Sequence, residues 1–377
     1  MSIVLNTEAP NSSSVNNEML FVAYEATKAI DPITYPDYAY VCDVYVASSL
    51  VGRLISRPDP EFNRGIFDVA PILRSYCSYG LDASAQAVDY TPYINYQLKF
   101  GEQYDATLYT NLLVDSSNRQ AFVSYKPKPF LTTEVLEAGI ASDRPNPSYH
   151  HKSVDQLLVP YYLNVTGTGD FQIEFKDDDD NTLSSQNISF TGQAAQTIRQ
   201  INVLNTAAPA AATKVALGIP GEAAEYIINF ICTKYTPYVI AWLNHYGAYE
   251  SQSFGLVSKK VLELMKKAFE QEDYRINASG EVSYQSNNVF YGGKKGYTTR
   301  VKISLNLTSH LLNDAEYVWL ADLFKSPDVY LYDDTENKFL PVTITATNYE
   351  YKTYLNSRLT PLQFTVEFST DHNSQFL

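Results

Sequence analysis

An alternation of apolar and polar residues is the feature that most constrains how this chain can fold. Residues 171–175 (Phe-Gln-Ile-Glu-Phe) show it most clearly, and residues 93–100 follow the same two-residue period. Successive side chains of a β-strand point to opposite faces of a sheet, so this period predicts strands with one buried face.

Other runs rich in β-branched and aromatic residues predict further strands between turn residues. They occupy residues 19–24, 38–46, 51–55, 121–125, 157–165, 188–190, 198–203, 215–217, 226–232, 238–243 and 249–254. Short strands at this spacing are typical of antiparallel sandwiches, so we expect a mainly β fold with two successive β-sandwich-like domains. Residues 207–212 contain Pro209 and are expected to form a loop.

Two segments before residue 300 carry helical signals. Residues 257–272 place apolar side chains at positions i, i+4, i+7, i+8, i+11 and i+12, with lysines on the opposite face, which predicts an α-helix. A short helical turn is expected around residues 70–78, with Asp68 as its cap and Pro71 in its first turn.

A C-terminal helix has the clearest boundaries. Asn313 or Asp314 is expected to cap it, and Pro327 lies just past its end. Its apolar stripe consists of Tyr317, Leu320, Ala321 and Phe324. The strands expected around this helix lie at 281–284, 289–291, 298–307, 329–332, 339–344, 348–354 and 362–368. This mixture predicts an α+β C-terminal module.

The length of 377 residues exceeds what one hydrophobic core usually serves, so several domains are expected. The loop-like residues 143–147 (Asp-Arg-Pro-Asn-Pro) give the best boundary signal. The prediction is therefore a set of four segments: a flexible N-terminal arm at 1–17, a β-sandwich-like domain at 18–147, a second β-sandwich domain at 148–255 and an α+β assembly module at 256–377.

The amino-acid composition favours a protein that makes contacts with partners and argues against one that grips nucleic acid. Tyrosines number 31, more than the 28 lysines and arginines together, and tyrosine provides rigid contact area that stays partly wet. The net charge of −14 repels phosphates, which argues against tight binding of nucleic acid, although an acidic surface could line a passage for DNA. Residues 251–305 run against this trend at +4; they are either a solvated basic face or a dock for an acidic partner.

The sequence shows no recognisable signal peptide, membrane helix or cysteine framework. Met1 to Glu8 lack the basic and apolar regions of a signal peptide, and no stretch approaches the length of apolar residues that a membrane helix needs. Cys42, Cys77 and Cys232 are too few and too widely spaced for a disulfide framework or a zinc pair, so we expect core thiols in a reducing compartment.

Three motifs resemble chemical sites without meeting their requirements. Residues 177–180 are four aspartates, but the glycine and glutamate of an EF-hand are missing, so a solvated hairpin tip is expected. His150 and His151 are neighbours on an extended chain and point to opposite faces. Residues 292–296 (Gly-Gly-Lys-Lys-Gly) lack the P-loop pattern and predict a basic hairpin turn. No GxSxG or HExxH motif is present, so no catalytic, cofactor-binding or metal site is predicted, and the chain is not expected to be an enzyme.

Four passages carry a resemblance to a known group of proteins. They are residues 40–46 with 57–58 and 67–73, residues 96–104, residues 232–249, and the C-terminal set Leu311-Leu312, Glu316, Trp319-Leu320, 326–331 and 340–342. In this order they resemble virion structural proteins of tailed phages that infect Bacteroidetes, the crAss-like group in particular. The family-like form of the third passage is Trp-Leu-Asn followed by a glycine pair; this chain has residues 242–244 and Gly247, with Ala248 in place of the second glycine. The resemblance also favours extended structure over residues 257–272, against the helical period.

The resemblance implies a non-enzymatic ring, collar or tail component of the virion, made in the host cytoplasm and placed in the neck or tail. Copies are expected to associate head-to-tail around the tail axis below the portal and to help form the genome-delivery channel. The expected partners are further copies, the portal and adjacent rings, with DNA at most passing through and no membrane. The alternative is a glycan- or receptor-binding adhesin at the virion periphery, in which two or three tyrosines would surround one concave site.

Overall fold

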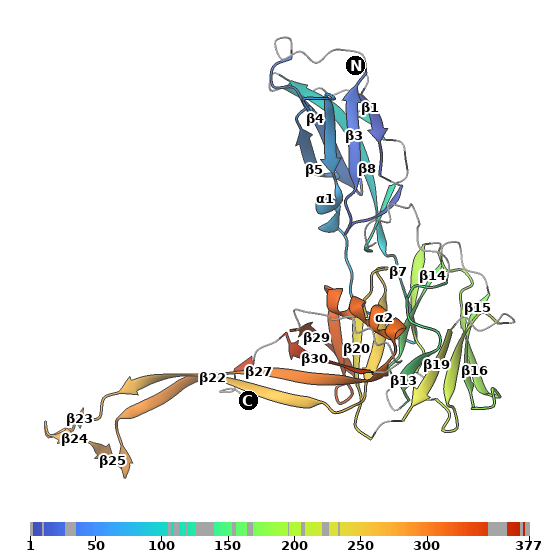
Figure 1. Cartoon of the computed structure of the whole chain (residues 1–377). Helices are drawn as coiled ribbons and strands as arrows, with labels where there is room; N and C mark the ends of the chain where they lie inside the picture. Colours follow the sequence, from blue (N-terminus) through green and yellow to red (C-terminus); the bar gives the residue numbers. More distant parts are fainter. Residues whose placement is uncertain are drawn as a thin grey trace. The chain divides into compact units, whose positions relative to one another are not determined.

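The protein is mainly β in the computed structural model (Figure 1). The structure describes residues 3–9, 11–26, 35–104, 107–108, 113–115, 117, 119–125, 139–152, 156–163, 169–194, 196–204, 208–220, 226–232, 234–345, 360–369 and 372–373. The chain divides into two compact units, residues 1–231 with 242–251 (unit 1) and residues 232–241 with 252–377 (unit 2).

The first core of unit 1 lies between a three-stranded and a seven-stranded sheet. The three-stranded sheet has the order β1 (Ile3–Thr7), β3 (Leu20–Glu25), β6 (Arg64–Asp68). The larger sheet has the order β2 (Ser12–Ser14), β11 (Arg119–Phe122), β8 (Tyr93–Tyr104), β4 (Ala39–Val46), β5 (Ser49–Ser56), with β9 (Thr107–Leu108) and β10 (Leu113–Val114) also paired to β8. Both sheets contribute to one buried cluster that includes Phe21, Tyr40, Phe67 and Phe100. Phe100 lies 5.9 Å from the ring of Phe21 and 6.0 Å from that of Phe67.

The N-terminal segment is paired, so the prediction of a flexible arm at 1–17 is wrong for its described residues. Strand β1 pairs antiparallel with β3, and β2 pairs parallel with β11. The buried guanidinium of Arg119 donates to the carbonyl of Ala9 at 2.7 Å and to the carboxylate of Glu8 at 2.5 Å. The polar side chains of this segment gave no indication that it forms strands. Strand pairing is made by main-chain hydrogen bonds, which do not depend on whether the side chains are polar.

The short helix α1 (Ala70–Arg74) confirms the helical turn expected after residue 69, in a shorter form. Its N-cap is Val69 rather than Asp68. Asp68 still serves the helix, because its Oδ1 accepts a hydrogen bond from the N–H of Ala70 at 3.1 Å and from the N–H of Met19 at 3.0 Å. Asp68 thus accepts a hydrogen bond from the first N–H of the helix although it lies one residue before the N-cap.

A second core in unit 1 lies between a four-stranded and a five-stranded sheet. The four-stranded sheet has the order β12 (Gly139–Ile140), β14 (Leu158–Leu163), β17 (Thr197–Asn202), β7 (Ala87–Tyr90). The five-stranded sheet has the order β13 (Ser148–His151), β19 (Tyr226–Ile231), β18 (Lys214–Gly218), β15 (Asp170–Lys176), β16 (Thr182–Ser189). Strand β15 buries Phe171, Ile173 and Phe175, as its alternation predicts.

Strand β7 shows that residues 143–147 do not separate two sets of sheets. It lies before this predicted boundary and pairs with β17, which lies after it, in a register that places Asp89 opposite Arg199. The two side chains form an ion pair at 3.0 Å. The pairing of segments about 110 residues apart has no local sequence signal.

Unit 2 contains the helix α2 and most of an eight-stranded sheet. The sheet order is β21 (Tyr249–Phe254), β20 (Tyr238–Leu243), β28 (Val329–Asp333), β29 (Lys338–Ile344), β30 (Thr360–Phe368), β27 (Gly293–Leu312), β22 (Lys259–Gln271), with β31 (His372–Asn373) paired to β27. Two short hairpins, β23 (Arg275–Ile276) with β24 (Val282–Ser283) and β25 (Gln285–Ser286) with β26 (Val289–Phe290), follow β22. Strands β20 and β21 carry the chain between the two units. The strand predicted at 348–354 lies outside the described residues.

The helix predicted at 257–272 is wrong. These residues form β22, a strand that pairs antiparallel with β27 from Lys259 opposite Asn306 to Gln271 opposite Gly293. The side chains of β22 are exposed along nearly its whole length. The apolar periodicity therefore does not report a buried helical face, and the extended form favoured by the family resemblance is the one observed.

Helix α2 (Asp314–Lys325) matches its prediction closely. Asn313 is the N-cap: its side chain accepts from the N–H of Glu316 at 2.9 Å, and the Glu316 carboxylate accepts from the N–H of Asn313 at 2.9 Å. The predicted stripe is buried at Tyr317, Leu320 and Ala321. Its last member, the half-buried Phe324, packs edge-on against Phe364 of β30 with ring centroids 5.3 Å apart.

Replacing the capping residue tests how much this helix depends on the reciprocal hydrogen bonds. Asn313→Ala removes the acceptor for the Glu316 N–H, and we expect a loss of about 1 kcal/mol in the free energy of unfolding. Equilibrium urea unfolding measures it. Asp314→Ala, which alters the first helical turn without removing the cap, should cost less than about half as much; equal losses would contradict the capping role.

Candidate interaction surface

The arm, defined here as residues 259–306, is the most exposed part of the described chain. Its shaft is β22 with the paired portion of β27, and its tip comprises residues 272–292 with the two short hairpins. From Gly293 to Thr299 the shaft is a two-stranded ribbon; farther in, β27 also pairs with β31 and β30. Figure 1 shows this ribbon extending beyond the other strands of its own sheet. Where the ribbon has only two strands it has no interior, so its side chains face solvent or a partner. Farther in, Val301 and Leu305 of β27 are buried.

The register of the shaft separates its side chains into two faces. Directly opposite residues share a face, so Leu262 and Leu264 of β22 stand beside Ile303 and Val301 of β27. We call this side the apolar face; Lys260 and Lys266 lie at its two ends. Leu262 and Leu264 remain 59% and 54% exposed. The opposite face mixes apolar and charged residues: Val261, Glu263, Met265, Arg300 and Lys302.

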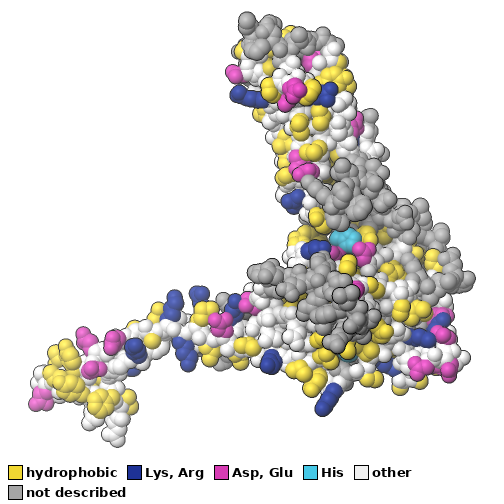
Figure 2. Space-filling view, in the orientation of Figure 1, with side chains coloured by type: hydrophobic (Ala, Val, Ile, Leu, Met, Phe, Trp, Pro, Cys, Tyr) yellow, Lys and Arg dark blue, Asp and Glu magenta, His cyan; other side chains and the backbone are white. Residues whose placement is uncertain are grey.

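The tip gathers further uncovered apolar side chains. Ile276 is 71% exposed and Phe290 is 72% exposed. Their exposed neighbours are Tyr274, Val282, Tyr284 and Val289. Figure 2 shows hydrophobic side chains concentrated at the end of the hairpin. Single exposed apolar residues are common on protein surfaces, but a contiguous group of this kind marks an interaction site.

Charge is distributed unevenly between the arm and the rest of the chain. The shaft carries eight Lys/Arg and two Glu, which gives +6, and the tip carries three Asp/Glu and one Arg, which gives −2. Dark blue side chains follow the shaft in Figure 2. Since the whole chain carries −14 and the arm +4, the remaining residues carry −18. The arm is therefore a basic, partly apolar projection on an acidic protein.

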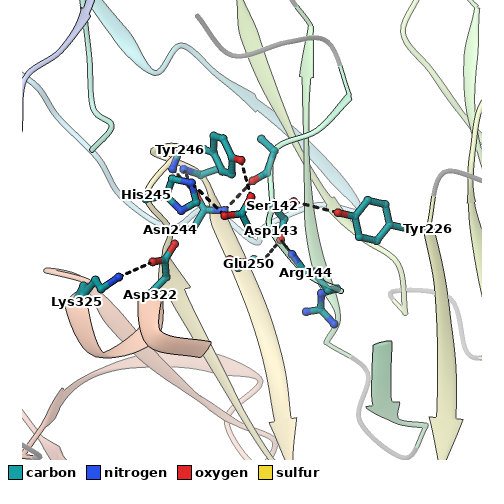
Figure 3. A network of polar contacts seen from close by, with 12 residues as sticks. Ser142, Asp143, Arg144, Tyr226, Asn244, His245, Tyr246, Glu250, Asp322 and Lys325 are labelled. Atoms are coloured by element: carbon teal, nitrogen blue, oxygen red, sulfur yellow. Dashed lines mark hydrogen bonds and ion pairs between the residues drawn. The ribbon is translucent and has the colours of Figure 1, made fainter. Parts of the chain in front are cut away.

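A polar network in unit 1 is the second notable cluster (Figure 3). It is centred on the turn between β20 and β21, where the Asn244 Nδ2 donates to the carbonyl of Ala141 at 2.7 Å. The Asn244 Oδ1 accepts from the N–H groups of Tyr246 and Ala248, both at 3.1 Å. The Tyr246 hydroxyl donates to Asp143 at 2.6 Å. These bonds attach the segment at 141–143 to the turn.

Buried polar groups continue the network along β21. The Ser142 hydroxyl donates to the carboxylate of Glu250, and the Arg144 guanidinium donates to the carbonyl of Ser251. The Tyr226 hydroxyl donates to the carbonyl of Ser142 at 3.0 Å. Ser142, Arg144 and Glu250 are all buried, so the hydroxyl and the carboxylate are closed to a substrate. The arrangement satisfies buried polar groups and orders a loop.

Gly247 lies in this turn with a positive φ of 81°. A Cβ at this position would overlap the main-chain carbonyl oxygen of Val123. The neighbouring Ala248 is fully buried and has no such restriction. This geometry explains why glycine is needed at 247 while alanine suffices at 248, where the family-like pattern has a second glycine.

The motifs weighed from the sequence are not brought together. Residues 177–180 form the hairpin tip expected between β15 and β16; Asp177 accepts from the N–H of Asp179 at 3.0 Å and of Asn181 at 2.9 Å. The hydrogen bonds from Asn181 lower the pKa of the Asp177 carboxyl. His150 and His151 are both buried in β13. Among the described residues, no group of three or more His, Cys, Asp or Glu could hold a metal ion.

Two smaller predictions need correction. Residues 293–296 form paired strand rather than a hairpin turn, because the chain reverses within residues 272–292. Of the three free cysteines, Cys42 is buried and Cys77 half-buried, but Cys232 is exposed and is not a core thiol. Burial raises the pKa of the Cys77 thiol to about 11, and it raises that of Cys42 further.

The sequence contained part of the signal for the arm. The excess of positive charge over residues 251–305 was visible, whereas the pairing of β22 with β27 was hidden by a helical period. Comparison with models of protein families gives no match, and no curated protein is significantly similar to the chain. In the described part of the chain, neither helix has the length and apolar character required to cross a membrane.

Shortening the arm tests whether it contributes to folding. Replacing residues 267–298 by Asn-Gly joins Lys266 to Thr299, its direct partner across the ribbon, through a two-residue turn. We expect the free energy of unfolding to change by less than about 0.5 kcal/mol, because the removed side chains are largely exposed. Urea unfolding checks this, and a loss above about 2 kcal/mol would show that the arm supports the core.

Gly247→Ala tests the close approach in the β20–β21 turn. We expect it to cost about 3 kcal/mol or more, since it combines backbone strain with overlap on the Val123 carbonyl. Gly192→Ala is the matched control: Gly192 has a φ of 82°, and a Cβ there meets nothing within 4 Å. The control should cost only the strain, about 1–2 kcal/mol, and equal costs in urea unfolding would rule out the steric explanation.

Proposed function

We propose that this chain is a non-enzymatic structural protein of a tailed-phage virion, a ring, collar or tail component that oligomerises around the tail axis below the portal. In this proposal two β-sandwich domains and the α+β module form the subunit wall. The proposal starts from the ordered resemblance of four passages to crAss-like virion proteins.

The single observation that carries the proposal is the arm. A long ribbon that leaves Leu262, Leu264, Ile276 and Phe290 more than half exposed is poorly suited to a free monomer. Coverage by another chain removes this apolar area from water. In an assembly, a neighbouring subunit is always close enough to cover this apolar area. A projecting ribbon can therefore connect one subunit to the next.

The charge of the chain supports a role beside DNA rather than on it. With −18 outside the arm, a lumen lined by the rest of the chain would repel phosphates. DNA could then slide through without binding. Portal and neighbouring ring proteins are the proposed partners, and the virion neck or tail is the proposed location.

The mass of the purified chain in solution, together with negative-stain images, tests the proposal. We expect closed rings, formed either by the chain alone or on addition of an adjacent neck protein, because a heterologous interface that closes produces a ring. Light scattering after gel filtration should give one mass that is an integral multiple of the 42.4 kDa subunit.

A different outcome would favour the adhesin. A stable monomer or trimer that binds defined sugars on a glycan array, and never forms rings with neck proteins, would contradict the proposal. In that case substitution of a few tyrosines around one concave site should abolish sugar binding.

A further inference from the structure

We infer that the arm of one copy docks through its apolar face onto the acidic surface of a second copy, so that each subunit donates one arm and receives another. This inference rests on the proposed function, since it names the contact by which the ring or tail layer forms. Its occupant is a second copy of this chain.

The arm is large enough to form a stable contact. A stable interface uses about 20–30 residues from each partner. The arm from 259 to 306 has 48 residues. Its shaft presents an ordered face on which Leu262 and Leu264 of β22 lie beside Ile303 of β27. Preorganised strands lose little conformational freedom on binding. The apolar face of the shaft and the adjoining tip together therefore offer sufficient surface.

The charge of the arm indicates which surface it contacts. The apolar face lies between Lys260 and Lys266, and the shaft as a whole carries a net charge of +6. Two shafts would repel each other, which disfavours a symmetric arm-to-arm pair. The body of another copy, at −18 outside its own arm, is complementary in charge. Arm and body are different surfaces, so the contact is heterologous.

The charges of the tip and the body favour a protein partner over a membrane. Exposed aromatic and aliphatic residues at a tip, with lysines behind them, could also enter an anionic bilayer. The tip carries Glu272, Asp273 and Glu281 against Arg275, and the body carries strong negative charge. Both would be repelled by anionic lipid, so the second copy is favoured.

A face-selective pair of variants tests the contact. Leu262→Asn with Leu264→Asn alters the apolar face, and Val261→Asn with Met265→Asn makes a comparable change on the opposite face, one residue away. All four side chains are exposed, so both variants should fold. We expect the first to weaken self-association about tenfold or more and the second less than about threefold, measured by sedimentation of the full chain. Equal effects, or none, would overturn the inference.

Charge reversal tests the acidic partner. Lys260→Glu with Lys266→Glu should weaken self-association about tenfold, and added salt should weaken the wild-type association because exposed charges are screened. Lys325→Glu with Lys338→Glu makes the same change in net charge at exposed positions outside the arm and is the control. A control that weakens association equally would show that overall charge, and not the arm, is responsible.

Mixing decides whether the contact is heterologous. The Leu262→Asn/Leu264→Asn variant lacks the apolar face but keeps its body, so it can receive an arm without donating a functional one. Added in excess to fluorescently labelled wild-type chain, it should bind and cap growth, giving small complexes in place of rings. Failure of the Leu262→Asn/Leu264→Asn chain to bind, as expected for arm-to-arm pairing, overturns the inference.

The inference and the proposed function fail separately. If Leu262→Asn/Leu264→Asn chains form the same rings as the wild type, the docking role of the arm is wrong and the ring component stands. If the wild-type chain stays monomeric alone but forms rings on a neck protein, the same holds. Flotation of the chain with anionic vesicles, lost on shortening the arm and unaccompanied by self-association, would assign the arm to a membrane and overturn the inference.

Discussion

Main-chain hydrogen bonding between segments far apart in sequence holds the sheets of this protein together. Strand β7 pairs with β17 about 110 residues later, β2 pairs with β11, and β13 pairs with β19. Buried N–H and C=O groups must be paired, so each of these strands is fixed only when its distant partner is present. This requirement also explains why polar segments such as Ser12–Ser14 are ordered: their strand pairing with β11 is made by the backbone.

The dependence of strands on distant partners also determines which elements could be predicted from the sequence. Strands with one buried face, such as β15, are predictable from the alternation of apolar and polar residues. Helix α2 is predictable from Asn313, Glu316 and its apolar stripe. Strands β1, β2, β7 and β13 were missed because they are short or polar and depend on remote partners. Sheet order across the predicted boundary at 143–147 could not follow from local signals, since loop closure between distant segments leaves no periodic pattern.

The interaction surface was predicted least well, for a definite reason. In β22 both faces carry apolar residues, with Val261 and Met265 on one and Leu262 and Leu264 on the other. Apolar positions on both faces of a strand can also satisfy a helical period, and here they did. Exposure cannot be read from periodicity at all. The polar network around Asn244 was likewise invisible, because it joins residues about 100 positions apart, although Gly247 in the same turn was noticed from the family-like pattern.

An edge strand with apolar side chains is a hazard for any soluble chain, because its unpaired main-chain groups accept strands indiscriminately. Strand β22 is such an edge, and it carries Lys259, Lys260, Lys266 and Lys267. Lysines on an edge oppose pairing with like-charged copies of the same strand. They do not oppose contact with an acidic surface. The distribution of charge on the arm therefore disfavours the arm-to-arm pairing that its apolar residues would otherwise promote, and it leaves available the contact with a surface of opposite charge.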